Sequence, residues 1–278
     1  MTRPTQMKHG SASSAGNAAA ELYLDLLKRS LTNTVFDAEP DIDDDEFRFT
    51  MQRVAHYVNT SAVSMIPLAR FDNIRECVES ILVDGVPGDL IETGVWRGGA
   101  VIFMRALLKL HGVTDRLVWG ADSFEGLPEP DPEKYPLEAK VQGGPVIQKA
   151  YHNLAVSLEE TQRNLSAYGM LDDQVRLLKG WFCDTLPNAS IAQLALIRVD
   201  GDFYASTRDA LVSLYDKLSI GGYVIIDDYG EDSWTYCRKA VDEFRAVRGI
   251  SDPIIPVDSK CVYWRRSAPD HPLRPAVP

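Results

Sequence analysis

Two short apolar segments that end in aspartates constrain the fold of this chain most. They are residues 194–204, LALIRVDGDFY, and residues 221–229, GGYVIIDDY. Short apolar segments bounded by glycine or aspartate are typical of buried strands in a parallel sheet. In open α/β sheets, ligands bind outside the carboxyl ends of the strands. The aspartates that we expect at this edge of the sheet are Asp200, Asp202, Asp227 and Asp228.

These aspartates predict a metal site. Carboxylates gathered at one edge repel each other unless a cation or shared protons hold them together, and Mg²⁺ prefers oxygen ligands of this kind. Helix capping could explain one or two of them. It explains adjacent Asp227 and Asp228 less well, because two neighbouring buried carboxylates are costly. The histidines are scattered without an HExxH pattern, so a zinc site is disfavoured.

Residues 88–266 alternate predicted strands and helices, which indicates a Rossmann-like, doubly wound, mostly parallel sheet. The predicted strands are 89–95, 116–122, 175–181, 194–202 and 223–228, followed by a closing pair at 254–257 and 261–264. The predicted helices are 98–110, 157–168, 207–218 and 233–248, and Ser206 with Asp209 predicts a capping box for the third.

The N-terminal part has a different pattern. Residues 1–20 are small and polar, which predicts disorder. Residues 21–87 hold three predicted helices, 21–36, 47–60 and 68–83, which we assign to a cap or lid over the carboxyl edge of the sheet. The connection 125–148, rich in proline and glycine, is long enough to be a functional lid. The tail 267–278 is predicted to be flexible.

The composition of the chain limits the classes of binding partner and the cellular compartment that we expect. The formal net charge of −11 argues against a nucleic-acid or an anionic-membrane partner, because both require a basic surface. The four cysteines show no CxxC pairing, which indicates reduced thiols. With no signal-peptide or membrane-spanning pattern in the sequence, we expect a cytoplasmic protein.

A glycine-containing loop, ETGVWRGG at residues 92–99, joins the first predicted strand of the sheet to its helix. Glycines there allow a ligand to approach the backbone and the free N–H groups of the helix. The spacing of Gly94, Gly98 and Gly99 is not GxGxxG, which weakens a dinucleotide interpretation. Glycines in such turns also serve packing alone.

Two further positions suggest a nucleoside ligand. Asp122 ends the second strand, where an acidic residue accepts hydrogen bonds from a ribose diol, although it could instead cap the next element. Trp181 and Phe182 follow the third strand and could sandwich a purine or line a pocket, but are equally well explained as core aromatics.

Five segments together resemble one family. They are SMIPLAR (64–70), IETGVWRGG (91–99), DSFEGLP (122–128), RVDGD (198–202) and residues 221–229. This combination resembles the macrocin O-methyltransferases, which use S-adenosylmethionine and Mg²⁺ to methylate deoxysugar hydroxyls on macrolide and aminocoumarin antibiotics. Within the family, the chain most resembles the enzymes acting on the noviose 4-hydroxyl of an aminocoumarin. The resemblance implies a glycosylated small-molecule acceptor and a homodimer formed through the N-terminal helices.

The resemblance also implies residue roles. Asp200, Asp227 and Asp228 would bind Mg²⁺, and Asp202 would be the catalytic base. More distantly, the layout resembles catechol O-methyltransferases, whose lysine base falls here at Phe203, so the base must lie elsewhere. The implied cofactor-binding residues are Glu92, Thr93 and Gly94 along the methionine part, Asp122 and Ser123 at the ribose, and Met65, Gly98, Ala100, Gly180, Trp181, Phe182 and Asp200 around them.

Two other functions are compatible with the residues alone. A metal-dependent sugar-nucleotide transferase could use Asp200, Gly201 and Asp202 as a DxD motif, although the acidic Glu92 loop does not suit a diphosphate. A non-catalytic protein of the same fold is the second alternative, and the intact set of aspartates argues against it.

Overall fold

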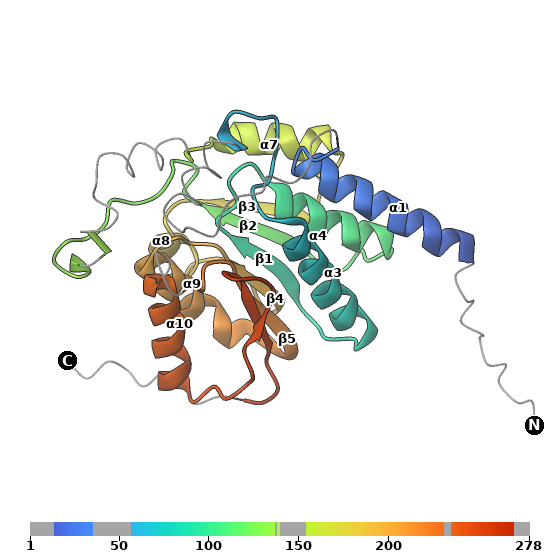
Figure 1. Ribbon diagram of the computed structural model, residues 1–278. Coiled ribbons are helices and arrows are strands. Elements are labelled where there is room, and N and C mark those ends of the chain that lie inside the picture. The colour runs from blue at the N-terminus through green and yellow to red at the C-terminus, as the bar shows by residue number, and fades with distance from the viewer. Residues whose placement is uncertain (1–13, 36–56, 137, 140–153, 231–234, 270–278) are drawn as a thin grey trace, which may run out of the picture.

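A mostly parallel sheet lies at the centre of the molecule (Figure 1). The computed structural model describes residues 14–35, 57–136, 138–139, 154–230 and 235–269. The sheet has seven strands in the order β3-β2-β1-β4-β5-β7-β6. Strands β1 to β5 are parallel, and β7 runs antiparallel to both β5 and β6. The predicted fold class is confirmed.

The elements follow the predicted alternation closely. The strands are β1 (Asp89–Thr93), β2 (Val118–Asp122), β3 (Val175–Lys179), β4 (Leu194–Val199), β5 (Leu218–Ile226), β6 (Ile255–Pro256) and β7 (Val262–Arg265). The helices are α1 (Ser14–Leu31), α3 (Leu68–Val83), α4 (Gly99–Leu110), α7 (Leu158–Ala167), α8 (Phe182–Thr185), α9 (Tyr204–Leu214) and α10 (Thr235–Arg248), with a 3₁₀ turn at η1 (Tyr215–Lys217).

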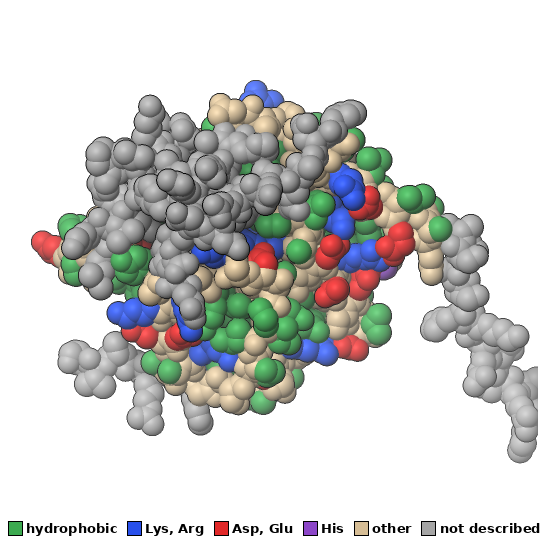
Figure 2. All heavy atoms as spheres, viewed as in Figure 1, with side chains coloured by type: hydrophobic (Ala, Val, Ile, Leu, Met, Phe, Trp, Pro, Cys, Tyr) green, Lys and Arg blue, Asp and Glu red, His purple; other side chains and the backbone are tan. Residues whose placement is uncertain are grey.

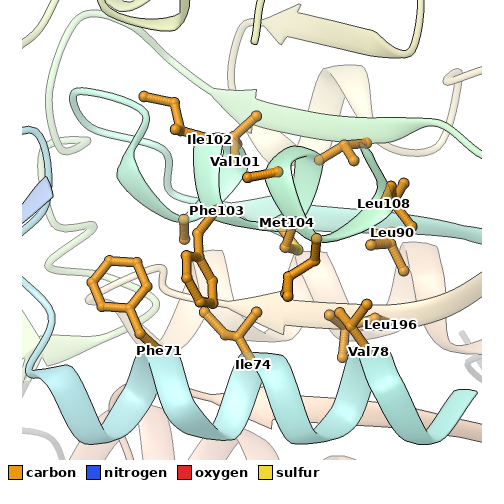
Figure 3. Packing of buried hydrophobic residues seen from close by; sticks show 14 of the residues in the cluster. Phe71, Ile74, Val78, Leu90, Val101, Ile102, Phe103, Met104, Leu108 and Leu196 are labelled. Atoms are coloured by element: carbon orange, nitrogen blue, oxygen red, sulfur yellow. The ribbon is translucent and has the colours of Figure 1, made fainter. Parts of the chain in front are cut away.

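Side chains that alternate along each strand supply two cores, one on each face of the sheet. Leu90 and Leu196 belong to the core shared with α1, α3 and α4, whereas Ile91 and Ile197 belong to the core shared with α9 and α10. In Figure 3, side chains of α3 point toward α4 and the strands behind it. The ring centroids of Phe71 and Phe103 lie 5.0 Å apart in an edge-on arrangement. Helices on both faces make the sheet doubly wound.

Helix α3 lies on a face of the sheet, whereas we had expected it in a cap over the carboxyl edge. Its buried residues pack against α4, β4 and β5. Ser64, just before α3, contacts α4 closely, since a Cβ on Gly99 would lie 2.4 Å from the Ser64 Cβ. The N-terminal helical region therefore contributes to the main core.

Two predictions for the starts of helices were wrong. Residues 14–20 are helical, because α1 begins at Ser14; alanine is the strongest helix former, and three alanines lie at 18–20. Helix α9 begins at Tyr204 without a capping bond from Ser206. Instead, the buried Glu138 carboxylate accepts the Tyr204 N–H at 2.6 Å. The expectations for residues 1–13, 47–56, 140–148 and 270–278 lie outside the described residues.

The strand register brings the predicted site residues together. Thr93, Val199 and Ile226 are aligned across β1, β4 and β5, so the residues that follow them lie side by side. The N–H of Asp200 donates to the Thr93 carbonyl, and the N–H of Asp227 donates to the Val199 carbonyl, both at 2.9 Å. Strand order reverses between β1 and β4, which is where ligands bind in such sheets.

Charged side chains of both signs are interspersed on the face shown in Figure 2. Near α1 and α3 they form ion pairs, with Lys28 bound to Asp72 and Arg75 bound to Glu21. Of the helices in the described ranges, none is both long enough and apolar enough to cross a membrane.

Candidate active site

A cavity opens at the carboxyl edge of the sheet, next to the point where the strand order reverses. About 670 Å³ of its space is not filled by atoms, a volume that includes the solvent at its open mouth. Its walls come from the loops after β1, β2, β3 and β4. The lining residues are Met65, Gly94, Trp96, Asp122, Ser123, Gly126, Leu127, Pro128, Leu154, Trp181, Phe182, Asp200, Gly201, Asp202 and Ser206.

Gly94 allows the β1 loop to pack directly against β4. Its φ is +92°, and a Cβ there would lie 1.7 Å from the backbone oxygen of Asp200. Every other residue type would clash with that backbone and be strained in this conformation. The glycine therefore fixes the floor of the cavity beside Asp200.

Asp122 holds the same loop from the other side. Its Oδ2 accepts the N–H groups of Val95 and Trp96 at 2.7 and 3.1 Å, and its Oδ1 accepts the N–H of Phe124 at 2.8 Å. Asp122 was predicted either to bind a ribose or to cap the next element, and the structure is compatible with both roles. It organises the loops and also lines the cavity, and its longest hydrogen bond, from the Ser123 hydroxyl at 3.4 Å, is the one that a ligand could most readily replace.

The structure does not place every predicted cofactor residue on the cavity wall. Glu92 and Thr93 are buried in the sheet, and Thr93 donates from its hydroxyl to the Arg198 carbonyl at 3.3 Å. Gly98, Ala100 and Gly180 are also not among the residues that line the cavity. Met65, Gly94, Asp122, Ser123, Trp181, Phe182 and Asp200 do line the cavity, so for them a direct cofactor contact has a geometric basis.

Arg198 joins the ends of three strands beneath the cavity. It is 1% exposed, and its Nη1 donates to Glu92 at 2.6 Å and to Asp200 at 2.9 Å. Its Nη2 donates to Asp227. Burial raises the pKa of Glu92 to about 8 despite the Arg198 charge, and one Glu92 oxygen has no hydrogen-bond partner. Glu92 is therefore an internal partner of Arg198 in this structure.

The three predicted metal ligands converge beside this arginine. Asp200, Asp227 and Asp228 each offer an oxygen, and these oxygens all lie within 4.8 Å of one another. Burial, and then the neighbouring carboxylates of Asp202, Asp200 and Asp227, raise the pKa of Asp228 well above its usual range. Among the described residues, Asp228 has no ion-pair partner. This excess of negative charge suits a divalent cation.

Asp202 lies between this cluster and the cavity. Its backbone N–H donates to Asp228 Oδ2 at 3.2 Å, and its φ of +58° is unusual for a residue other than glycine. Burial and the nearby carboxylates of Asp200, Asp227 and Asp122 raise its pKa well above the usual range. Strained residues with shifted pKa values cluster at functional sites.

The sequence analysis missed the arginines that organise these carboxylates. Arg70, on α3, binds Asp227 and Asp258, and Arg198 was quoted only as part of a motif. The available signal was an arginine inside the apolar segment LALIRV, since arginine is rarely buried unless paired. The lining residues given no role in methyl transfer or cofactor binding were Trp96, Gly126, Leu127, Pro128, Leu154, Gly201 and Ser206.

A doubly wound sheet with this cavity beyond β1, β2 and β4 defines a Rossmann-like ligand-binding protein. Residues 38–266 match the family model described as Macrocin-O-methyltransferase (TylF), so the chain belongs to that family, as the resemblance predicted. It is therefore an enzyme, an O-methyltransferase. Family membership removes the sugar-nucleotide transferase and the non-catalytic protein as alternatives.

The chain is similar to named relatives over nearly its whole length. It is 48% identical to a Streptomyces olivaceus 8-demethyl-8-(2,3-dimethoxy-alpha-L-rhamnosyl)-tetracenomycin-C 4'-O-methyltransferase, covering 93% of this chain and 98% of the relative. It is 45% identical to a Streptomyces niveus demethyldecarbamoylnovobiocin O-methyltransferase, covering 90% and 95%. The solved structure of the O-methyltransferase NovP is 45% identical with a TM-score of 0.78, covering 90% of this chain and all of that one.

Proposed function

We propose that this enzyme transfers the methyl group of S-adenosylmethionine to a deoxysugar hydroxyl on a glycosylated antibiotic, with Mg²⁺ bound at Asp200, Asp227 and Asp228. The observation that carries the proposal is the convergence of these carboxylates around Asp200, which lines the same cavity as the β1 and β2 loops. One cavity then serves both the methyl donor and the hydroxyl that receives the methyl group.

The cavity walls suit such a cofactor. Trp181 and Phe182 offer aromatic surfaces for a purine, and Asp122 and Ser123 offer polar atoms for a ribose. Met65 supplies a flexible apolar contact on the same wall. In this proposal Glu92, Thr93, Gly98, Ala100 and Gly180 support the cofactor loops from behind.

Asp202 is the proposed base. A sugar hydroxyl is a weak acid, so its proton must leave as the oxygen attacks the methyl carbon. The C–O bond forms while the C–S bond breaks, which yields a methyl ether and S-adenosylhomocysteine, and Asp202 accepts the proton. A divalent cation, when bound at the three aspartates, lowers the pKa of a coordinated hydroxyl and of nearby carboxylates. The protein contributes alignment of oxygen, carbon and sulfur, part of the roughly 7–11 kcal/mol available from proximity.

For the acceptor, we propose the noviose 4-hydroxyl of an aminocoumarin. The support is the resemblance of the motifs and the similarity to the novobiocin enzyme and to NovP. The tetracenomycin enzyme, at 48% identity, makes a rhamnosyl 4'-hydroxyl the competing acceptor.

Incubation of the enzyme with isotope-labelled S-adenosylmethionine and both desmethyl glycosides, read by mass spectrometry, tests this function. We expect the aminocoumarin to gain one labelled methyl group faster than the tetracenomycin glycoside. The reverse preference would reassign the acceptor, and labelling of neither glycoside would contradict sugar methylation.

We further propose a cytoplasmic homodimer. The described cysteines are all free thiols, as expected in a reducing compartment. Helix α1 leaves Leu22 and Leu26 73% and 58% exposed, which is apolar surface available for a second copy. Sedimentation of the purified chain as a monomer would contradict the dimer.

Cofactor binding should depend on Asp122. Replacing it by alanine removes a charged acceptor and loosens the Val95–Trp96 turn. We expect a loss of about 10- to 100-fold in affinity for S-adenosylmethionine, because a hydrogen bond to a charged group contributes roughly 1.5–3 kcal/mol. Calorimetry measures the change.

The matched control is Asp89→Ala. Asp89 also accepts a backbone N–H, that of Leu117 at 2.9 Å, but at the opposite edge of the sheet. It should leave cofactor affinity unchanged. Equal affinities for wild type and Asp122→Ala would place the ribose elsewhere.

A further inference from the structure

Arg70 occupies a position where a positive charge is unfavourable. It lies in the first turn of α3, and its side chain is 5% exposed. Burial penalises a charge, and the positive end of the helix dipole repels a cation in the first turn. The arginine must therefore be stabilised by its partners, Asp227 and Asp258, and Asp227 is a proposed metal ligand.

The guanidinium of Arg70 is held in one orientation by Asp258. Its Nε donates to Asp258 Oδ2 at 2.7 Å, and its Nη2 donates to Asp258 Oδ1 at 3.1 Å. Asp258 lies in the turn between β6 and β7, where its Oδ1 also accepts the N–H groups of Lys260 and Cys261, both at 2.8 Å. This two-point contact fixes the direction in which Nη1 of Arg70 points.

Nη1 of Arg70 points at the carboxylate of Asp227. Nη1 of Arg70 donates to Asp227 Oδ2, while Arg198 donates to Asp227 Oδ1. Each oxygen of the carboxylate therefore accepts from a different arginine, one from α3 and one from β4. Two fixed donors set the plane of the carboxylate, and each oxygen keeps a lone pair for a further partner.

We infer that Arg70 is a positioning residue for the metal site, which orients Asp227 as a ligand through its contact with Asp258. The inference rests on the proposed Mg²⁺ site. Arg70 is the last residue of SMIPLAR (64–70), one of the segments that carry the family resemblance. The sequence alone did not indicate a function for this arginine. Partners that orient metal ligands in this way typically change metal affinity by 10- to 100-fold.

The test is the Mg²⁺ affinity of the folded protein, measured by calorimetry with S-adenosylhomocysteine present. We expect Arg70→Gln to bind Mg²⁺ about 10- to 100-fold more weakly than wild type. Arg70→Lys keeps the charge without the planar fork, so its affinity should fall between the two. Asp258→Asn should weaken binding in the same direction by a smaller factor. Affinity for S-adenosylhomocysteine without Mg²⁺ should not change.

Arg105 provides a matched control. It is also 5% exposed and forms a two-point ion pair with an aspartate, Asp172, but on α4 away from the metal site. Arg105→Gln and Asp172→Asn should keep wild-type Mg²⁺ affinity even if they lower the melting temperature. If Arg70→Gln does not fold, Arg70→Lys and Asp258→Asn decide the question.

Each outcome separates the inference from the proposed function. Wild-type Mg²⁺ affinity in the Arg70 and Asp258 variants would overturn the inference and leave the metal site standing. Equal losses in the Arg70 and Arg105 variants would make Arg70 a structural residue only. Absence of Mg²⁺ binding in the wild type would remove the metal site and the inference with it.

Discussion

Replacing Asp202 by asparagine should lower turnover by about 10²- to 10⁴-fold, the range that a positioned base contributes. Affinity for S-adenosylmethionine should remain close to that of the wild type. Asparagine is nearly isosteric and tolerates a positive φ, so it can keep the backbone conformation at +58° and the N–H donated to Asp228. The variant therefore removes the proton acceptor without remodelling the cavity.

The pH dependence of turnover gives a second measurement of the same residue. Burial and the neighbouring carboxylates raise the pKa of Asp202, and a base works only in its deprotonated form. A bound cation lowers this pKa again, so wild-type turnover should fall as the pH is lowered toward the pKa that Asp202 has in the Mg²⁺-loaded enzyme. Asp202→Asn should lose this dependence, because its residual rate no longer requires the group to be ionised.

Asp209→Asn is the control for this prediction, because Asp209 lies on the following helix and does not line the cavity. Its turnover and pH profile should match those of the wild type. Steady-state kinetics at saturating acceptor supplies both readouts. Undiminished turnover of Asp202→Asn would exclude Asp202 as the base.

The fold could be predicted because its signals are local. Apolar segments such as residues 194–199 and 223–226 are too short for helices and end in aspartate, so both their type and their direction follow from the sequence. The edge at which the aspartates meet then follows from parallel strand order. Register completes the arrangement, and hydrogen bonds from Asp200 and Asp227 to neighbouring strands show why these residues meet.

Other parts of the site depend on contacts between distant segments, which one sequence does not reveal. Arg70 meets Asp227 and Asp258 across 157 and 188 residues of chain. The start of α9 is set by Glu138, 66 residues before Tyr204, and this overrode the local Ser206 signal. The family resemblance implied that Glu92 contacts the cofactor, but its side chain is buried and paired with Arg198.

Removing divalent cations with EDTA should abolish methyl transfer, and added Mg²⁺ should restore it. Asp228→Asn tests the same site in the chain itself. Asp228 is the best choice because its loss releases no arginine, whereas Asp200 and Asp227 are both bound to Arg198. We expect a loss of Mg²⁺ affinity at least as large as the roughly 10- to 100-fold seen when partners of metal ligands are removed.

The control is Asp89→Asn at the opposite edge of the sheet, which should keep wild-type Mg²⁺ affinity and activity.

Because the pKa of Asp228 is raised, Mg²⁺ must displace protons, so affinity should increase with pH and binding should release protons. Titrations in two buffers of different ionisation enthalpy measure that release. Full activity after exhaustive chelation would contradict the metal site.

The same substitution should make the cation-free protein more stable. A carboxyl group whose pKa is raised by folding is ionised more easily in the unfolded chain, so folding stability falls as the pH rises above the usual value toward the raised one. At neutral pH an uncharged asparagine side chain at this position avoids the penalty and can still accept the N–H of Asp202. Asp228→Asn should therefore melt at a higher temperature than wild type in EDTA, and this advantage should shrink or reverse with Mg²⁺. A carboxylate that lowers stability until a cation arrives is expected at a functional site, where stability and activity conflict. A lower melting temperature for Asp228→Asn in EDTA would show that Asp228 supports the fold instead.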